Sequence, residues 1–163
     1  IEPEWASLNT RTIPGNALHL PWRNGCFDAI CTSPTYGNAM ADHLRNPDNW
    51  ARGYNYITYA QKLSRALSLD NSGTMKWGKA YQNFHVRAWT EARRVLIPGG
   101  KFVLNIKDHI RNGERQYVTD WHIETLIGLG FSVLEHVKID CPGMRFGSNS
   151  DRRVKYESVV LLV

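Results

Sequence analysis

Two polar segments follow apolar runs directly, at points where catalytic or binding residues could stand. Residues 33–38 (SPTYGN) follow the run 27–32 (FDAICT), and residues 107–109 (KDH) follow the run 102–106 (FVLNI). The first segment combines a hydroxyl group, a proline carbonyl and an aromatic ring, which can accept hydrogen bonds and stack on a planar ligand. Because ligands of open α/β sheets bind at the carboxyl ends of the strands, both segments are candidate site residues.

Hydrophobic periodicity predicts the elements that position these segments. Residues 27–32 and 102–106 have the length and apolar character of buried parallel strands. Apolar residues recur at helical spacing from Phe84 to Val95, and Pro98-Gly99-Gly100 is expected to end that helix. An earlier helix is expected around residues 63–67, after a long polar loop over residues 36–59.

The last third of the chain predicts one more helix and two strands. Thr119 is expected to be the N-cap of a helix that carries Ile123 and Leu126, with Gly130 just after its C-terminus. Residues 131–139 and 156–163 read as strands joined by a loop at residues 143–153. The order of elements indicates an α/β fold, an open sheet that ends in an antiparallel hairpin.

Composition and charge narrow the class of protein. The 163 residues, 42% hydrophobic and 21% charged, allow one domain with a buried core and exclude a repeat array or a disordered tail. The net charge of +5 suits a polyanionic partner without requiring one. The sequence has neither the roughly 18 consecutive apolar residues of a membrane span nor a signal peptide, so we expect a cytoplasmic protein with no membrane partner.

Cysteine usage predicts neither disulfides nor a metal site. Cys26, Cys31 and Cys141 form no CxxC pair and no zinc-like spacing with histidine, so we expect reduced and mostly buried thiols. The sequence also does not indicate a nucleophilic cysteine that follows a proline, because Cys141 precedes Pro142 instead.

Ser33-Pro34-Thr35-Tyr36 closely resembles the Asp/Asn/Ser-Pro-Pro-Tyr motif of methyltransferases that modify exocyclic amino groups of DNA bases. Residues 15–21 (GNALHLP) resemble the family's Gly-Asp-Ala-Leu-x-Leu-Pro segment, and residues 94–100 (RVLIPGG) resemble its turn after the helix. The resemblance spans nearly the whole chain. It implies a Rossmann-like class I methyltransferase sheet, S-adenosyl-L-methionine as cofactor and double-stranded DNA as partner.

The resemblance also implies roles for the motif residues. The lone pair of a base's amino nitrogen is delocalised into the ring, so two acceptors, Ser33 Oγ and the Pro34 carbonyl, would favour a pyramidal, nucleophilic nitrogen. Tyr36 would stack on a base swung out of the duplex. Thr35, Gly37 and Asn38 would complete the substrate site, with Thr35 tolerated in place of the family's second proline. Serine at the first position favours cytosine N4 over adenine N6.

For the cofactor, the resemblance implies Glu2, Asn16 and Ala17. Asn16 stands where the family has an aspartate that contacts the adenine amino group, and Glu2 is nearest to the acidic ribose ligand. The family's aromatic-x-Gly-x-Gly loop is absent from the sequence. We therefore expect residues 1–163 to form a single but partial catalytic domain, with the cofactor loop before Ile1.

Arg145, Arg152 and Arg153 form a basic loop that could contact DNA phosphates, although basic loops are also common as solvated surface. Phosphate contacts would position the duplex without reading its sequence. Two alternatives stay open: amino methylation of RNA or of a protein glutamine, and a non-catalytic remnant that binds nucleic acid.

Overall fold

The structure is a computed structural model that describes residues 15–37, 68, 70–141 and 150–163. Within these ranges the chain forms six strands, two α-helices and two short 3-10 helices. In chain order they are β1 (Phe27–Thr32), η3 (Ser72–Thr74), α3 (Lys79–Val95), β2 (Leu96–Ile106), β3 (His109–Arg111), β4 (Glu114–Gln116), α4 (Val118–Gly128), β5 (Val133–Asp140), η4 (Ser150–Arg152) and β6 (Tyr156–Leu162).

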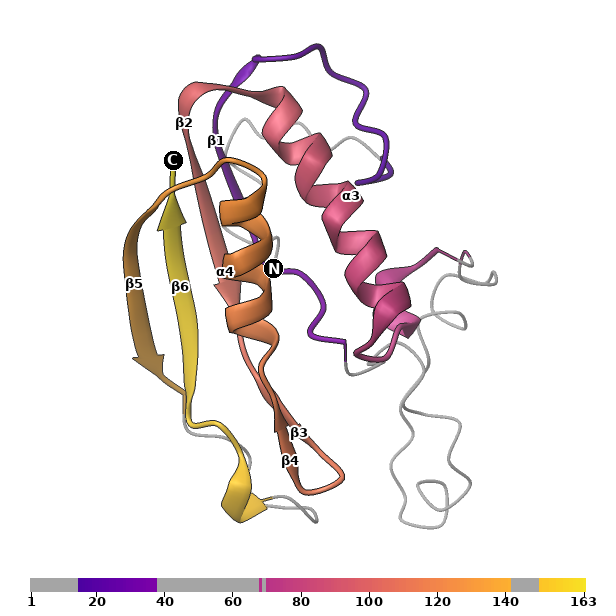
Figure 1. Ribbon diagram of the computed structural model, residues 1–163, viewed down its shortest axis with the longest axis vertical. Helices are drawn as coiled ribbons and strands as arrows, with labels where there is room; N and C mark the ends of the chain where they lie inside the picture. The colour runs from indigo at the N-terminus through magenta and orange to yellow at the C-terminus, as the bar shows by residue number, and fades with distance from the viewer. Residues whose placement is uncertain (1–14, 38–67, 69, 142–149) are drawn as a thin grey trace, which may run out of the picture.

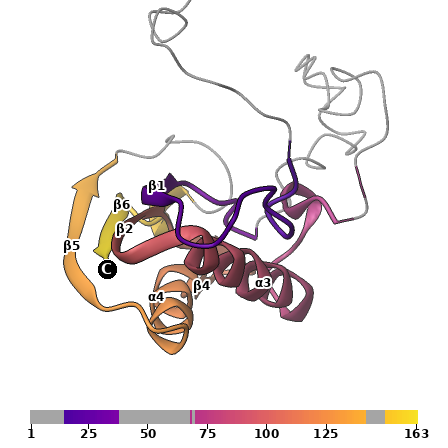
Figure 2. The ribbon, with the colours of Figure 1, turned by 90° about the horizontal axis from the view of Figure 1, so that it is seen from above.

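The main sheet has the strand order β1-β2-β6-β5. β1 and β2 are parallel, whereas β6 is antiparallel to both β2 and β5. Both α-helices lie on the same face of this sheet (Figures 1 and 2). The predicted α/β fold, its order of elements and its antiparallel ending are therefore confirmed, and the additions in the described ranges are the hairpin β3–β4 and the 3-10 helices η3 and η4.

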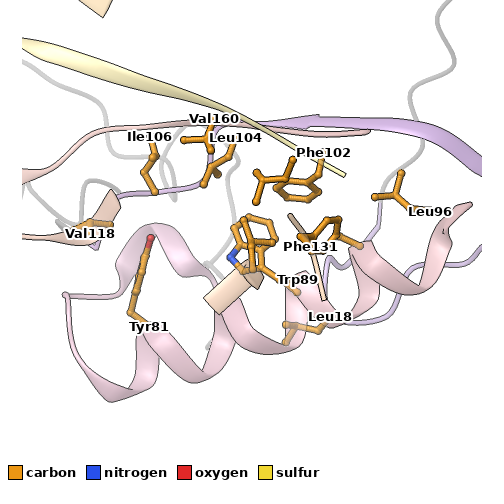
Figure 3. Packing of buried hydrophobic residues seen from close by; sticks show 14 residues of the cluster. Leu18, Tyr81, Trp89, Leu96, Phe102, Leu104, Ile106, Val118, Phe131 and Val160 are labelled. Atoms are coloured by element: carbon orange, nitrogen blue, oxygen red, sulfur yellow. The ribbon is translucent and has the colours of Figure 1, made fainter. Parts of the chain in front are cut away.

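The core lies between α3, α4 and the covered face of the sheet. β2 alternates, with Phe102, Leu104 and Ile106 fully buried, and the buried face of α3 contains the predicted apolar stripe at Ala88, Ala92 and Val95. Trp89 packs edge-on against Phe102 with ring centroids 5.4 Å apart (Figure 3). Helix α3 begins at Lys79, one turn before the predicted stripe, and so adds Tyr81 to the core.

Residues 27–32 form the predicted parallel strand, but the prediction that this strand is buried was wrong. β1 is an edge strand of the described sheet, and Ala29 and Cys31 are exposed on the face that α3 and α4 do not cover. Asp28 is also exposed, where the pairing of β1 with β2 is irregular. The prediction of mostly buried thiols was also wrong, since Cys31 is exposed and Cys26 and Cys141 are half-buried. All eight residues of β5 are likewise exposed.

Helix α4 begins at Val118, so Thr119 is not its N-cap as predicted. Tyr117 holds that position and makes no side-chain cap, while the buried carboxylate of Asp108 accepts a hydrogen bond from Thr119 N–H at 2.8 Å. A carboxylate at a helix N-terminus satisfies an orphan donor and complements the helix dipole. Gly130, with φ +91°, follows the end of the helix as predicted.

Strand β2 begins at Leu96, immediately after α3, rather than beyond residues 98–100 as predicted. Pairing with β1 jumps from Phe27–Leu96 to Ala29–Lys101, so the Pro-Gly-Gly turn forms a bulge inside the strand. A Cβ atom at Gly100 would lie 3.0 Å from the Ile97 carbonyl oxygen and 3.2 Å from that of Asp28. The glycine therefore permits close approach of the two strands.

In the described ranges, no helix combines the length and apolar character that a membrane crossing needs. The same residues contain no group of three or more His, Cys, Asp or Glu side chains that could hold a metal ion. Several predictions lie outside the described ranges. These are the loop beyond Gly37, the helix at 63–67, Glu2, Asn38 and Arg145.

Candidate functional site

The motif loop, residues 33–37, starts where β1 ends. Thr32 pairs with Leu104 of the parallel strand β2, so the loop leaves the sheet beside Asn105. Ser33 is exposed, Tyr36 is half-buried, and Ser33 Oγ lies 3.3 Å from Tyr36 Oη in a hydrogen bond that either group could donate. The structure thus brings together two of the predicted catalytic side chains at the carboxyl end of the strands.

Three polar side chains lie near the motif: Asn105 on β2, Glu157 on β6 and Cys141 directly after β5. Asn105 Nδ2 donates to Glu157 Oε2 at 3.4 Å, and Cys141 Sγ lies 3.8 Å from Glu157 Oε1. Burial raises the pKa of Tyr36; the hydrogen bond with Ser33 opposes this, and the acidic groups of Glu157 and Cys141 reinforce it. Tyr36 therefore keeps its proton at neutral pH, and its ring remains uncharged.

Sequence reasoning missed Glu157 and Cys141 as neighbours of the motif. They reach this end of the sheet because β6 is antiparallel to β2, with Ser158 paired to Ile106. Cys141 follows through a backbone hydrogen bond from its N–H to the Lys155 carbonyl at 2.7 Å. No spacing signal in the sequence could have found them, because only strand register decides which residues meet.

Two hydrogen bonds fix the motif loop to the segment before α3. Thr35 Oγ1 donates to the Ser72 carbonyl at 3.1 Å, and Trp77 N–H donates to the Gly37 carbonyl at 2.6 Å. Gly37 has φ +69°, and a Cβ atom there would lie 3.0 Å from the Trp77 backbone, so glycine is required. The hydroxyl of Thr35 gives the loop an anchor that a proline in the same position could not supply.

Asn16 and Ala17, predicted to bind cofactor, are exposed. Asn16 Oδ1 accepts a hydrogen bond from Leu18 N–H at 3.0 Å, and its Nδ2 donates to Asp70 Oδ2 at 3.2 Å. The segment after Asp70 contacts Thr35 through Ser72, so one short stretch of chain connects Asn16 with the motif loop. The role of Asn16 and Ala17 in cofactor binding stays a prediction.

Asp108 and His109, which follow β2, differ in their hydrogen bonding. Asp108 is buried, and besides capping α4 it accepts from Arg115 Nε at 2.9 Å. His109 is half-buried, and neither of its ring nitrogens has a partner in the described part of the chain. Burial lowers the pKa of His109, so its ring is neutral near pH 7.

Of the predicted phosphate ligands, the structure describes Arg152 and Arg153. Arg152 is exposed, and its Nη1 donates to the Gly113 carbonyl in the β3–β4 turn at 3.4 Å. Arg153 is half-buried and also interacts with other groups. Arg152 therefore lies against the hairpin that extends beyond the sheet in Figure 1. Phosphate contacts stay a prediction.

Comparison with solved structures shows which fold this is. The chain matches a candidate DNA modification methylase from Thermus thermophilus, solved with S-adenosyl-L-methionine, at 16% identity and a TM-score of 0.55, over 91% of this chain and 52% of that one. The fold of the present chain is thus similar to that of solved DNA methyltransferases. The cytosine-N4-specific PvuII DNA methyltransferase matches at 14% identity and a TM-score of 0.55, over 91% of this chain and 46% of that enzyme.

The chain thus spans about half the length of these methyltransferase structures. No protein-family model matches the chain, and neither does any curated protein sequence. The expected Rossmann-like methyltransferase sheet is confirmed by the shared fold.

Proposed function

We propose that this protein is an S-adenosyl-L-methionine-dependent DNA methyltransferase that modifies an exocyclic amino group, cytosine N4 in preference to adenine N6. The proposal depends on one observation: Ser33 and Tyr36 form a hydrogen-bonded pair at the carboxyl ends of β1 and β2. The fold shared with solved DNA methyltransferases supports it, as does the complex of one of them with S-adenosyl-L-methionine.

The geometry supports different roles for the residues of the motif loop: Tyr36 would stack on the base, and Ser33 and Pro34 would accept hydrogen bonds from its amino group. Tyr36 is protonated and half-buried, so its ring can present a face to a flipped base. When the Ser33 hydroxyl donates to Tyr36 Oη, both lone pairs of Ser33 Oγ are free to accept from the substrate amino group. With the Pro34 carbonyl as second acceptor, the amino nitrogen becomes pyramidal and nucleophilic. Once methylated, it releases its proton to water.

The described residues fit the cofactor at Asn16. Its Oδ1 accepts one hydrogen bond from Leu18, and a carbonyl oxygen has a second lone pair that could accept from the adenine amino group. Ala17 and Glu2 would complete this side of the site. S-adenosyl-L-methionine supplies an electrophilic methyl group when bound. Because the chain spans about half of the solved enzymes, we also propose that residues 1–163 are part of one catalytic domain.

Tritium transfer from labelled S-adenosyl-L-methionine tests this function, with the protein expressed from its complete reading frame. Ser33→Ala is expected to lower kcat roughly 100-fold, the scale of losing one preorganised hydrogen-bonding group. Tyr36→Ala loses the stacking face as well, whereas Tyr36→Phe keeps it. Ser132→Ala is the matched control because Ser132 is exposed and lies before β5. Full activity of both alanine variants at 33 and 36 would contradict the site.

Competition between acceptors tests the substrate class. Duplex DNA, RNA and protein are offered together, and the methylated product is digested and identified. We expect N4-methylcytosine from DNA; label in RNA or glutamine would establish the alternative methyltransferases. Calorimetry with S-adenosyl-L-methionine separates all of these from a non-catalytic remnant, since a remnant would bind none.

We also propose that Arg145, Arg152 and Arg153 contact the phosphates of duplex DNA. The reaction would take place in the cytoplasm.

A further inference from the structure

A chain of hydrogen bonds runs through the core from helix α3 to helix α4, back to α3, and then to the backbone of the motif loop. Trp89 Nε1 donates to His122 Nδ1 at 2.9 Å, and His122 Nε2 lies 2.8 Å from Tyr81 Oη. Tyr81 Oη then donates to the Thr35 carbonyl. Tyr81 and His122 have no exposed surface, and Trp89 is 6% exposed. We call these three side chains the relay.

The chemistry of the two end groups, an indole N–H and a carbonyl, determines which atom carries each proton in the relay. An indole N–H can only donate, so His122 Nδ1 carries no proton and Nε2 carries one. A carbonyl can only accept, so the Tyr81 hydroxyl donates to Thr35 and must accept from His122 Nε2–H. Each joint therefore has one donor and one acceptor, and the Tyr81 hydroxyl can point in a single direction.

The relay is held neutral. Burial lowers the pKa of His122 well below its usual value, and the neighbouring His85 reinforces this. A proton added at Nδ1 would also face the N–H of Trp89. His122 therefore does not act as a base, because one nitrogen already carries a proton and the other is occupied.

The relay reaches the motif at the peptide group between Thr35 and Tyr36. Thr35 Oγ1 is held by Ser72 and the Gly37 carbonyl by Trp77, so Tyr81 adds a third contact, at the peptide group between Thr35 and Tyr36. That peptide plane sets the direction of the Tyr36 side chain. Figure 3 shows the Tyr81 ring standing away from α3 with its oxygen at the far end.

We propose that Tyr81, His122 and Trp89 are positioning residues that orient Tyr36 through the Thr35 carbonyl. The inference rests on the proposed function for the role of Tyr36, whereas the relay itself does not depend on it. A buried network in which every group is satisfied is rigid and has one arrangement. It keeps the stacking face in place before the substrate base arrives.

The first test needs no activity and uses the protein expressed from its complete reading frame. Nitrogen-15 spectra of the histidine rings are expected to show His122 as the Nε2–H tautomer at neutral pH. Carbonyl carbon-13 spectra are expected to show a Thr35 signal that shifts in Tyr81→Phe, which removes only the hydroxyl. Tyr117→Phe is the matched control, because Tyr117 is 58% exposed. An Nδ1–H tautomer, or an unchanged Thr35 signal, would overturn the relay.

The second test measures catalysis in the protein expressed from its complete reading frame. Tyr81→Phe is expected to lower kcat by about 10- to 100-fold, the scale of a small misplacement of a reacting group. KM for S-adenosyl-L-methionine should stay unchanged, and kcat is calculated per folded protein, because a smaller folded fraction would also lower the apparent kcat at constant KM. A wild-type kcat in Tyr81→Phe would overturn the positioning role. If the wild-type protein transfers no methyl group, the proposed function fails, and the spectra still decide on the relay.

Discussion

The two loops that flank β1 are both held by helix α3, but by opposite kinds of interaction. Before the strand, Arg94 donates to the carbonyls of Leu20 and Trp22 and forms a two-point ion pair with Glu91, at 2.8 Å in each contact. After the strand, the motif loop is held by neutral, buried groups that end in Tyr81. One helix thus fastens one loop with charge near the surface and the other with fixed dipoles in the core.

This difference shows what each loop needs. An ion pair near the surface is screened by salt and contributes little, which is sufficient for a connection. A buried neutral network cannot exchange its partners with water, and each broken contact leaves an unsatisfied group. The more exacting anchor is therefore placed beside the candidate site. The comparison leads to three predictions.

The largest expected effect is that acid destabilises the folded protein through the buried groups that hold the motif loop. Burial lowers the pKa of His85, which stacks on Tyr81 with ring centroids 4.0 Å apart, from 6.5 to about 4. The unfolded chain therefore binds a proton before the folded chain does. Stability is complete above pH 6.5 and falls as the pH drops toward 4, by about 3 kcal/mol for this group alone. Urea titrations across that range measure it.

The charged side should respond in a different pH window. Hydrogen bonds from Arg94 lower the pKa of Glu91 from 4.5 to about 2, so the contribution of this ion pair to stability is complete above pH 4.5 and is lost progressively as the pH falls toward 2. Near pH 5, amide exchange should rise in the motif loop while the loop before β1 stays protected. His85→Phe, which keeps a ring on Tyr81, should reduce the dependence on pH. Unfolding free energies that are equal at pH 7 and pH 5 would contradict the prediction.

A smaller loss of stability is expected when one glycine in each loop is replaced by alanine. Gly25 and Gly37 have φ +58° and φ +69°, so alanine at either position costs about 1–2 kcal/mol of backbone strain. At Gly25 the new Cβ would be 3.9 Å from its nearest neighbour, whereas at Gly37 it would be 3.0 Å from the Trp77 backbone. Gly37→Ala should therefore destabilise the protein more, as measured by urea unfolding. Equal losses of unfolding free energy in the two variants would contradict the prediction, because they would show that the motif loop can adjust to the added Cβ atom.

The smallest effect is expected from Arg94→Gln. This change removes the ion pair with Glu91 but leaves the relay intact, so the loss of stability should be less than for Gly37→Ala. It should also shrink between low salt and about 1 M salt, because exposed charges are screened. Arg87→Gln is the control, since Arg87 is exposed on the same helix. A loss that is independent of salt would show that packing, not charge, holds the loop before β1.

Local patterns were enough to predict most elements and the location of the motif. The helical spacing from Phe84 to Val95 and the glycine after α4 were correctly assigned, because both signals are properties of neighbouring residues. Thr119 was misassigned as a cap, since the capping group, Asp108, comes from a different segment. The burial of β1 was also wrong, because exposure depends on which strands and helices surround it.

The sequence by itself determined the types of residue at the site: a hydroxyl, a proline carbonyl and an aromatic ring directly after a strand. Only the tertiary structure decided what surrounds them. Strand register brings Glu157 to Asn105, and helix packing brings Tyr81 and His122 to the Thr35 carbonyl. Hydrogen bonds between segments 40 or more residues apart depend on how whole elements pack, and no local periodicity encodes that distance.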